Sequence, residues 1–414
     1  MNGFSILFLG ALAAMLVAQI WLGLRHICHV QSHRDRVPQA FRDRVPLADH
    51  RKAADYTVAT TRFGLIDDAA GALLLVLWTL GGGLDLLDRL WRSLGYGPIV
   101  TGSAFILSLF LVTGALNLPF SAYQTFVIEE RFGFNKTTIG LFIADLAKQA
   151  LLLAVIGIPL VFAVLWLMQA MGPRWWLYVW ALWGGFTLIM VWAYPVLIAP
   201  LFNKFSPLGD ADVKNRIQSL LDRTGFRSRG IFVMDGSRRS AHGNAYFTGF
   251  GKNKRIVFFD TLLETLGGGE IEAVLAHELG HFRRHHVLKR LLLTFGVALA
   301  GLYLLAWLMN QAWFYHGLGM SRPSTYAALA LFLMAGPVFM FFLQPLRSWS
   351  SRRHEFEADA YAAEQADVRA LVTALVKLYR ENANTLTPDP VYSAFYDSHP
   401  PAPVRIARLE ALAT

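Results

Sequence analysis

The chain has 414 residues, of which 55% are hydrophobic and only 16% are charged, and its formal net charge is +9 at pH 7. An ordinary soluble domain is about 45–50% apolar and about 25% charged, so the composition excludes a typical soluble protein and predicts a polytopic membrane protein. The single cysteine, Cys28, excludes an internal disulfide.

Seven apolar stretches are long enough to cross a hydrocarbon core about 30 Å thick, which requires roughly 20 helical residues. In chain order they lie near residues 4–24, 67–88, 99–118, 149–171, 176–199, 291–312 and 325–346. No lysine or arginine precedes the first stretch, so we expect a retained helix and not a secretory signal peptide.

The basic residues predict the orientation of these helices. Of the 38 lysines and arginines, 34 lie in the segments 25–66, 119–148, 200–290 and 347–414. The positive-inside rule places these segments in the cytoplasm and the N-terminus outside. We expect a bacterial inner membrane. Because topology explains the positive charge, a nucleic-acid partner is not indicated.

The organisation follows from these assignments. We expect an N-terminal membrane domain of five helices (1–199), a first cytoplasmic part (200–290), a membrane helix pair (291–346) and a second cytoplasmic part (347–414). Each cytoplasmic part alone is small for an independently folded domain, but together they have a suitable size for one hydrophobic core. We therefore expect them to fold together around the last two membrane helices.

The first cytoplasmic part combines strands and a helix. The segments I-F-V-M (231–234) and I-V-F-F (256–259) are typical of short buried strands. A run of three glycines, 267–269, precedes a predicted helix that starts near Glu270.

That helix carries A-H-E-L-G-H, residues 276–281. His277 and His281 are four residues apart, so both imidazoles project from one helix face and can share a tetrahedral zinc ion. Glu278 is turned away from that face, where its carboxylate can take a proton from a reacting water and pass it to the leaving amine. Gly280 stands where a side chain would block a neighbouring backbone. The alternative is a chance match to a short motif.

A zinc site needs a third ligand, and the histidines just downstream do not supply it. His285 continues the spacing of four, but on a straight helix it lies about 12 Å along the axis from His277. We interpret His285 and His286 as interfacial residues beside Lys289 and Arg290.

A better candidate lies in S-R-R-H-E-F-E-A-D-A-Y, residues 351–361. Glu355 can complete a His₂Glu site that leaves one position for water. Asp359 shares its helix face and can accept a hydrogen bond from a ligand histidine. The alternative for this acidic pair, beside Arg352 and Arg353, is a solvated, salt-bridged helix face.

These residues resemble the type I CAAX prenyl endopeptidases, integral-membrane zinc proteases of the gluzincin kind. The resemblance covers most of the chain and rests on seven segments in the same order. They are I-E-E-R-F-G-F-N-K-T-T (128–138), I-A-P-L-F-N-K-F-S-P-L (198–208), R-S-A-H-G-N-A-Y-F-T-G-F (239–250), K-N-K-R-I-V-F-F-D-T-L (252–262), A-H-E-L-G-H (276–281), S-R-R-H-E-F-E-A-D-A-Y (351–361) and S-H-P-P-A-P-V-R-I-A-R-L (398–409).

The resemblance implies a mainly α fold: seven transmembrane helices surround a chamber, and a zincin-like α+β metallopeptidase domain is split around the last two helices. It implies one Zn²⁺ per chain, held by His277, His281 and Glu355, with Glu278 as the catalytic base. One departure is Glu357, where the family usually has glutamine; a second carboxylate there could compete with Glu355 for the metal.

Other site residues are also implied by the resemblance. The stretch Asn244, Ala245 and Tyr246 is similar to the substrate-pairing edge strand of the family. His399 stands where a histidine is thought to stabilise the oxyanion; the alternative is a loop histidine made rigid by two prolines. Arg405 could brace the acidic residues of the site.

The sequence thus predicts a membrane-embedded zinc endopeptidase that cleaves hydrophobic or prenylated (CAAX-type) substrates near the cytoplasmic face. The expected partners are a peptide substrate and the lipid bilayer, and a monomer would suffice. One alternative is an intramembrane protease of the site-2 type, which charged residues around the motif disfavour. The other is a non-catalytic transporter or scaffold, which the complete ligand set disfavours.

Overall fold

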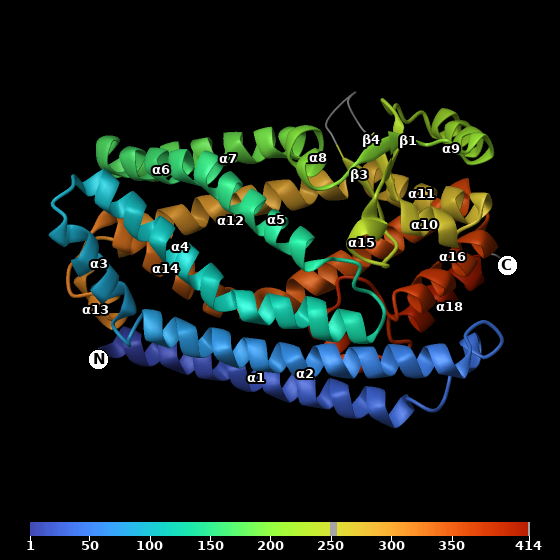
Figure 1. The fold of residues 1–414 in the computed structure, drawn as a ribbon, viewed down its shortest axis with the longest axis horizontal. Helices are drawn as coiled ribbons and strands as arrows, with labels where there is room; N and C mark the ends of the chain where they lie inside the picture. The colour runs from blue at the N-terminus through green and yellow to red at the C-terminus, as the bar shows by residue number, and fades with distance from the viewer. Residues whose placement is uncertain (249–254, 413–414) are drawn as a thin grey trace.

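The computed structural model describes residues 1–248 and 255–412, and the protein is predominantly helical (Figure 1). The α-helices are α1 (Gly3–His33), α2 (Leu47–Trp78), α3 (Gly83–Ser93), α4 (Pro98–Tyr123), α5 (Ile139–Leu152), α6 (Ile158–Ala170), α7 (Trp175–Ala193), α8 (Ala199–Phe202), α9 (Ala211–Thr224), α10 (Asp260–Thr265), α11 (Gly268–Arg283), α12 (His286–Leu308), α13 (Ala312–Gly317), α14 (Thr325–Met340), α15 (Gln344–Gln365), α16 (Val368–Glu381), α17 (Pro390–Tyr396) and α18 (Ala402–Leu412). The strands are β1 (Phe205–Pro207), β2 (Ile231–Met234), β3 (Ala245–Thr248) and β4 (Arg255–Phe259).

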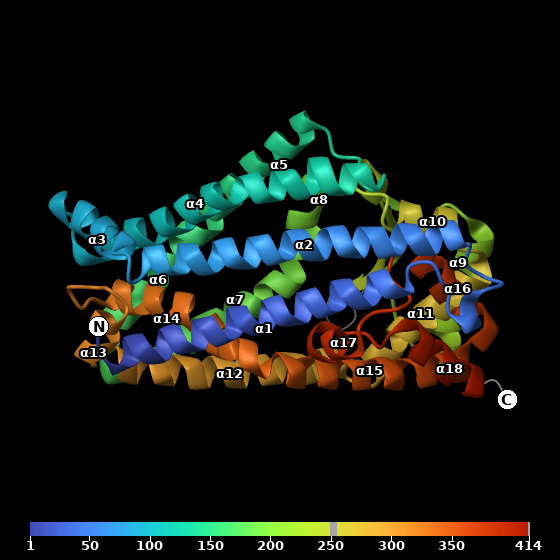
Figure 2. The same cartoon turned by 90° about the horizontal axis from the view of Figure 1, so that it is seen from below.

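The apolar stretches form long helices that lie along the longest axis of the molecule (Figures 1 and 2). Within the described residues, six helical runs are long and apolar enough to cross a membrane, and a bent helix pair makes a seventh. Only 11% of the apolar window in the runs Ile139–Ala170 and His286–Leu308 is buried. Such low burial is expected where helices face lipid on one side and an open interior on the other. The prediction of a mainly helical membrane fold with seven spans is confirmed.

The predicted bounds of the second span, 67–88, are wrong. The helix α2 begins at Leu47, ends at Trp78, and is followed by α3 at an angle of 48°. Three glycines explain the break: Gly82 has a φ of +81°, and a Cβ on Gly81 would lie 2.7 Å from the carbonyl oxygen of Leu77. Charged residues in the first half of α2 hide that half from a hydropathy window.

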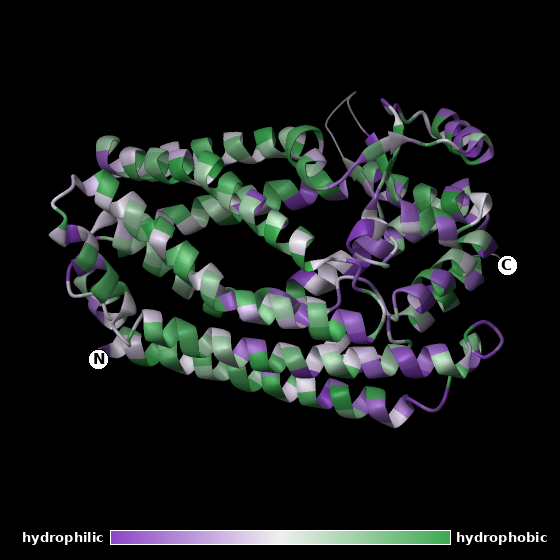
Figure 3. Cartoon of the chain, viewed as in Figure 1, coloured by the Kyte–Doolittle hydropathy of each residue, from purple (hydrophilic) through white to green (hydrophobic). Residues whose placement is uncertain are grey.

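The polar residues gather at one end of the bundle (Figure 3), where a small sheet and the remaining helices form an α+β block. The order of the described strands is β1-β2-β4-β3. The predicted strands 231–234 and 256–259 are confirmed as the parallel central pair β2 and β4. The strand β3 pairs antiparallel with β4 and forms one edge of the sheet.

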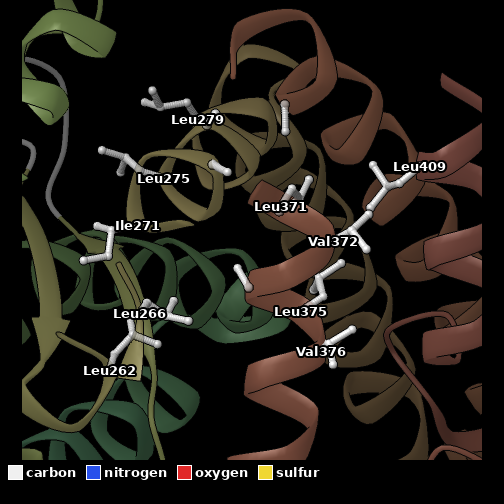
Figure 4. Close-up of a cluster of buried hydrophobic side chains, with 14 of the residues drawn as sticks. Leu262, Leu266, Ile271, Leu275, Leu279, Leu371, Val372, Leu375, Val376 and Leu409 are labelled. Atoms are coloured by element: carbon white, nitrogen blue, oxygen red, sulfur yellow. The ribbon is translucent and has the colours of Figure 1, made fainter. Parts of the chain in front are cut away.

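One hydrophobic core joins the two parts of the chain that were predicted to fold together, residues 200–290 and 347–414 (Figure 4). Leu275 and Leu279 on α11 belong to the first part, and Leu371 and Leu375 on α16 belong to the second. Phe41, from the connection between α1 and α2, is also fully buried in this core. The α+β block is therefore built from three separate stretches of sequence.

The two helices that carry the motifs extend from the last two membrane helices. The last span does not stop near residue 346, because α14 continues through a 3₁₀ turn into α15, so that Thr325–Gln365 is one 41-residue helical run. Only Arg284 and His285 separate α11 from α12. The backbones of α11 and α15 also touch: a Cβ on Gly280 would lie 2.9 Å from the Cα atom of Ala358.

This contact predicts the effect of one added methyl group. Gly280→Ala should destabilise the protein by about 1–3 kcal/mol, because the new Cβ meets backbone atoms that cannot rotate away. Gly269→Ala on the same helix is the matched control, since nothing lies within 4 Å of a Cβ there. The control should be neutral or stabilising by up to about 1 kcal/mol. Thermal unfolding in detergent measures both, and equal effects would contradict the contact.

Candidate metal centre

Three predicted side chains converge where α11 meets α15. The Nε2 atoms of His277 and His281 are 3.3 Å apart. Nε2 of His277 lies 3.3 Å from Oε2 of Glu355, and Nε2 of His281 lies 3.3 Å from Oε1 of the same carboxylate. Among the described residues, these three form the one group of histidine, cysteine and acidic side chains with metal-ligand spacing.

The spacing fits a tetrahedral ion. Ligand atoms about 2.0–2.1 Å from a tetrahedral zinc lie about 3.3–3.4 Å from one another. The two imidazole nitrogens are separated by this distance, and each lies 3.3 Å from one of the two Glu355 oxygens. The carboxylate is buried, with 4% of Glu355 exposed. Its Oε2 atom has no hydrogen-bond partner within the described part of the chain, and Nη1 of Arg405 lies 3.8 Å from it, beyond hydrogen-bond distance. A buried carboxylate oxygen without a partner is costly unless a cation binds it, so the residues present fit a metal ion.

Asp359 and Arg405 hold His277 from behind. Nδ1 of His277 is 2.8 Å from Oδ1 of Asp359, which directs its N–H at the carboxylate and leaves Nε2 free to bind. Nε and Nη2 of Arg405 each donate to Asp359 at 2.7 Å. Nη2 also lies 3.0 and 3.1 Å from the two ring nitrogens of His277, so the guanidinium packs against the imidazole ring.

Arg405 remains charged although it is only 6% exposed. Burial by itself would lower the pKa of this guanidinium, but the hydrogen bonds and charge of Asp359, together with the charge of Glu355, raise it above its ordinary value. The site therefore contains a buried cation that balances part of its negative charge.

Glu278 lies beside the ligands and lines a cavity. It is partly buried, and within the part of the chain that the structure describes its side chain forms no hydrogen bond or ion pair. The cavity, of about 280 Å³, is also lined by Asn244, Ala245, His277 and His399. The base candidate and the start of the edge strand therefore face the same space.

Tyr246 is not brought to that cavity. Its ring packs against Phe259, and its hydroxyl lies 3.9 Å from the sulfur of Met234. Of the three predicted residues of the edge strand, Asn244 and Ala245 line the site, whereas the Tyr246 side chain points elsewhere.

His399 stands on the open side of the centre. Its Nε2 is 3.5 Å from Oε1 of Glu355, and Oγ of Ser398 is 2.9 Å from its Nδ1. The side chain is 61% exposed. It lines both the cavity beside Glu278 and a second one of about 440 Å³. A donor in this place can reach a ligand that extends between the two cavities.

The interpretation of His286 as interfacial is wrong. Its side chain is 1% exposed, and its Nδ1 lies 3.1 Å from Nδ1 of His281. The prediction assumed a straight helix, but α11 ends at Arg283, and the exposed His285 takes a left-handed conformation that turns His286 back toward the site. A helical sequence pattern carries no signal for a left-handed residue at position 285.

Glu357 does not reach the metal ligands. Its carboxylate accepts from Nε of Arg353 at 3.2 Å and lies 3.0 Å from Nε2 of His286. The group with metal-ligand spacing contains Glu355 and not Glu357. Between the two alternatives, the geometry favours Glu355.

Because Arg405 is buried with Asp359, replacing Arg405 should destabilise the protein much more than replacing the exposed Arg408. Arg405→Met leaves the Asp359 carboxylate buried without its cation, which should destabilise the protein by about 3–5 kcal/mol. Arg408→Met is the matched control, since Arg408 is on the same helix but exposed. Thermal unfolding measures the difference, and a loss no greater than that of the control would contradict the assigned pairing.

Two protein-family models match the chain, and both describe proteases. Residues 26–204 match the family model described as the CAAX prenyl protease N-terminal region with five membrane helices. Residues 207–413 match the model of peptidase family M48. The predicted family is therefore confirmed along almost the whole chain.

Individual relatives extend the agreement. A CAAX prenyl protease 1 homologue of Arabidopsis thaliana is 40% identical over 299 residues, which cover 71% of this chain and 70% of the relative. CAAX prenyl protease 1 of Saccharomyces cerevisiae is 31% identical over 407 residues, covering 91% of this chain and 88% of the relative.

The fold has a close counterpart among solved structures. The crystal structure of S. mikatae Ste24p matches it with a TM-score of 0.92 and 29% identity, covering 99% of both chains. The chain therefore belongs to peptidase family M48 and is a multi-pass membrane metalloendopeptidase homologous to CAAX prenyl protease 1.

Proposed function

We propose that this protein binds one zinc ion through His277, His281 and Glu355 and hydrolyses a peptide bond in prenylated, CAAX-type substrates. The observation that carries the proposal is the set of equal 3.3 Å separations between the three ligand groups. Two imidazoles and one carboxylate, with a fourth position left for water, are the ligand set of a catalytic zinc.

A zinc ion at this site would polarise the scissile carbonyl and lower the pKa of water toward ~7. Glu278 then serves as the general base, because its carboxylate lines the cavity and has no partner among the described residues. It accepts the proton of the attacking water and later delivers it to the leaving amine. His399 donates a hydrogen bond to the carbonyl oxygen as that oxygen gains negative charge. Asp359 and Arg405 orient His277.

The substrate binds as an added strand on β3. The backbone N–H of Phe259 donates to the carbonyl of Asn244 at 2.9 Å, so the alternation of an antiparallel pair directs the peptide groups of Ala245 away from β4. The N–H of Ala245 donates to its neighbour Oδ1 of Asn244 at 2.8 Å, which a substrate carbonyl would replace. An extended peptide paired there runs past Glu278.

Two further observations support the membrane setting of the reaction. The ligand helices α11 and α15 adjoin α12 and α14, so a substrate with a lipid in the bilayer can present its peptide to the site. We propose that the block made of residues 200–290 and 347–414 faces the cytoplasm, as the basic residues indicate. The relatives compared above are eukaryotic, and a bacterial inner membrane stays a prediction.

The alternative functions receive less support. An intramembrane protease of the site-2 type would carry its motif within a spanning helix, but α11 is not among the helices apolar enough to span. A transporter or scaffold would not require a buried carboxylate oxygen placed for a metal beside a glutamate that has no partner in residues 1–248 and 255–412.

Glu278→Gln tests the assigned base. The variant should retain stoichiometric zinc, because Glu278 is not in the ligand group, and it should lose essentially all turnover, because an amide cannot accept the proton. Glu272→Gln, on the same helix but ion-paired with Arg223 away from the site, is the control and should keep its activity. Metal analysis and peptide cleavage give both readouts; substantial activity in Glu278→Gln would refute the assignment.

The substrate class has a separate test. Purified protein in lipid vesicles should cleave a farnesylated CAAX peptide with a much lower KM than the same peptide without the lipid, because the prenyl chain partitions into the apolar bundle and bilayer. Mass spectrometry of the products identifies the cleaved bond. Equal KM values for the two peptides would contradict a prenyl-directed enzyme.

A further inference from the structure

His286 lies next to the candidate metal centre but has no role in the catalytic steps proposed above. His286, at the start of α12, is almost completely buried, with 1% of its surface exposed. Its Nδ1 lies 3.1 Å from Nδ1 of His281, and its Nε2 lies 3.0 Å from Oε2 of Glu357. His286 therefore connects a metal ligand to a carboxylate on α15.

The backbone is shaped to place this side chain. A helix that continued straight from α11 would carry His286 past the site. Instead, His285 adopts φ +57° and ψ +30°, a left-handed conformation that is uncommon for a residue other than glycine. The turn reverses the side chain of His286 onto the ligand helix. The ring of His354 stacks on the ring of His286, with 4.0 Å between the ring centroids and an interplanar angle of 14°.

The proton positions along this connection follow from the metal ligand. When Nε2 of His281 binds a cation, its neutral ring carries the proton on Nδ1. That N–H can only donate, so Nδ1 of His286 must be the acceptor. The proton of a neutral His286 is then on Nε2, from which it donates to Glu357. A single arrangement of protons satisfies both hydrogen bonds.

Each of the two ligand histidines has a carboxylate of α15 behind it, on the side away from the metal position. Asp359 accepts directly from His277 at 2.8 Å, whereas His281 is separated from its carboxylate by the ring of His286. Glu357 is itself fixed by Arg353, whose Nε donates to it at 3.2 Å. One helix, α15, thus supplies the carboxylate for the metal and the carboxylates behind both histidines.

We propose that His286 and Glu357 are positioning residues that orient His281 and fix its tautomer for zinc. The inference rests on the zinc site of the proposed function and adds two residues to it. Partners behind a metal-bound histidine typically contribute about 10–100-fold to metal affinity.

Zinc retention tests the proposal without reference to activity. The detergent-purified proteins are loaded with zinc and then titrated with a chelator, and the zinc dissociation constant is measured. His286→Phe keeps an aromatic ring on His354 and loses both hydrogen bonds, so it should weaken zinc binding about 10–100-fold. His286→Asn places a carbonyl oxygen where Nδ1 was, accepts from His281, and should retain most of the affinity.

A second pair of variants acts from the other end of the connection. Glu357→Met removes the acceptor of the His286 proton and should weaken zinc binding, although less than His286→Phe. Glu357→Gln keeps an acceptor oxygen and should restore the affinity. His354→Phe is the control, because it preserves the stack on His286 and lies outside the hydrogen-bonded connection.

The outcomes separate this inference from the metal site itself. A wild-type protein that retains no zinc would overturn the zinc centre and this inference with it. If the wild type binds zinc and His286→Phe binds it equally tightly, the positioning role alone is refuted. A purely structural role would lower the unfolding temperature of the metal-free protein, leave the dissociation constant unchanged, and show no rescue by His286→Asn or Glu357→Gln.

Discussion

The contact between the backbones of α11 and α15 is the constraint on which the site depends. Gly280 lets the two helices approach so closely that a Cβ there would lie 2.9 Å from the Cα atom of Ala358, and this approach brings the histidines of α11 within reach of Glu355 on α15. Because α11 adjoins α12 and α15 continues from α14, the last two membrane helices hold the ligand helices from one end, while the core shared with α16 holds them from the other. Two stretches separated by a membrane hairpin can therefore form one rigid centre.

Buried charge is the second feature that unites the site. Three acidic residues on α15 face different partners: Glu355 the ligand histidines, Glu357 the ring of His286, and Asp359 both His277 and Arg405. Glu355 and Asp359 are buried and Glu357 is partly exposed, and each has a cation, an N–H donor or the place of a metal beside it, since an isolated buried carboxylate is unstable. The arrangement leaves Glu278 as the carboxylate beside the three candidate ligands without a partner in the described chain, which suits a group that must exchange a proton.

Much of this could be predicted from sequence, and the exceptions have physical causes. Hydropathy located the spans because length and apolarity suffice to cross a bilayer, but it could not place α2, whose polar first half and glycine break escape a window average. The spacing of His277 and His281 predicted a shared helix face, and Gly280 was predicted as a close approach. His286 was missed because a left-handed residue at position 285 cannot be inferred from a helical pattern. The edge position of Asn244 and Ala245 came only from the family resemblance, since alternation does not reveal which strands are central.

The central claim is that one zinc ion joins the two ligand helices. Crystals of the protein grown with zinc and measured on both sides of the zinc absorption edge test it directly, because the anomalous difference locates the ion independently of the chain. The account predicts a single strong peak about 2.0–2.2 Å from Nε2 of His277, Nε2 of His281 and a carboxylate oxygen of Glu355. A peak elsewhere, or none between these three residues in a fully loaded crystal, would contradict it.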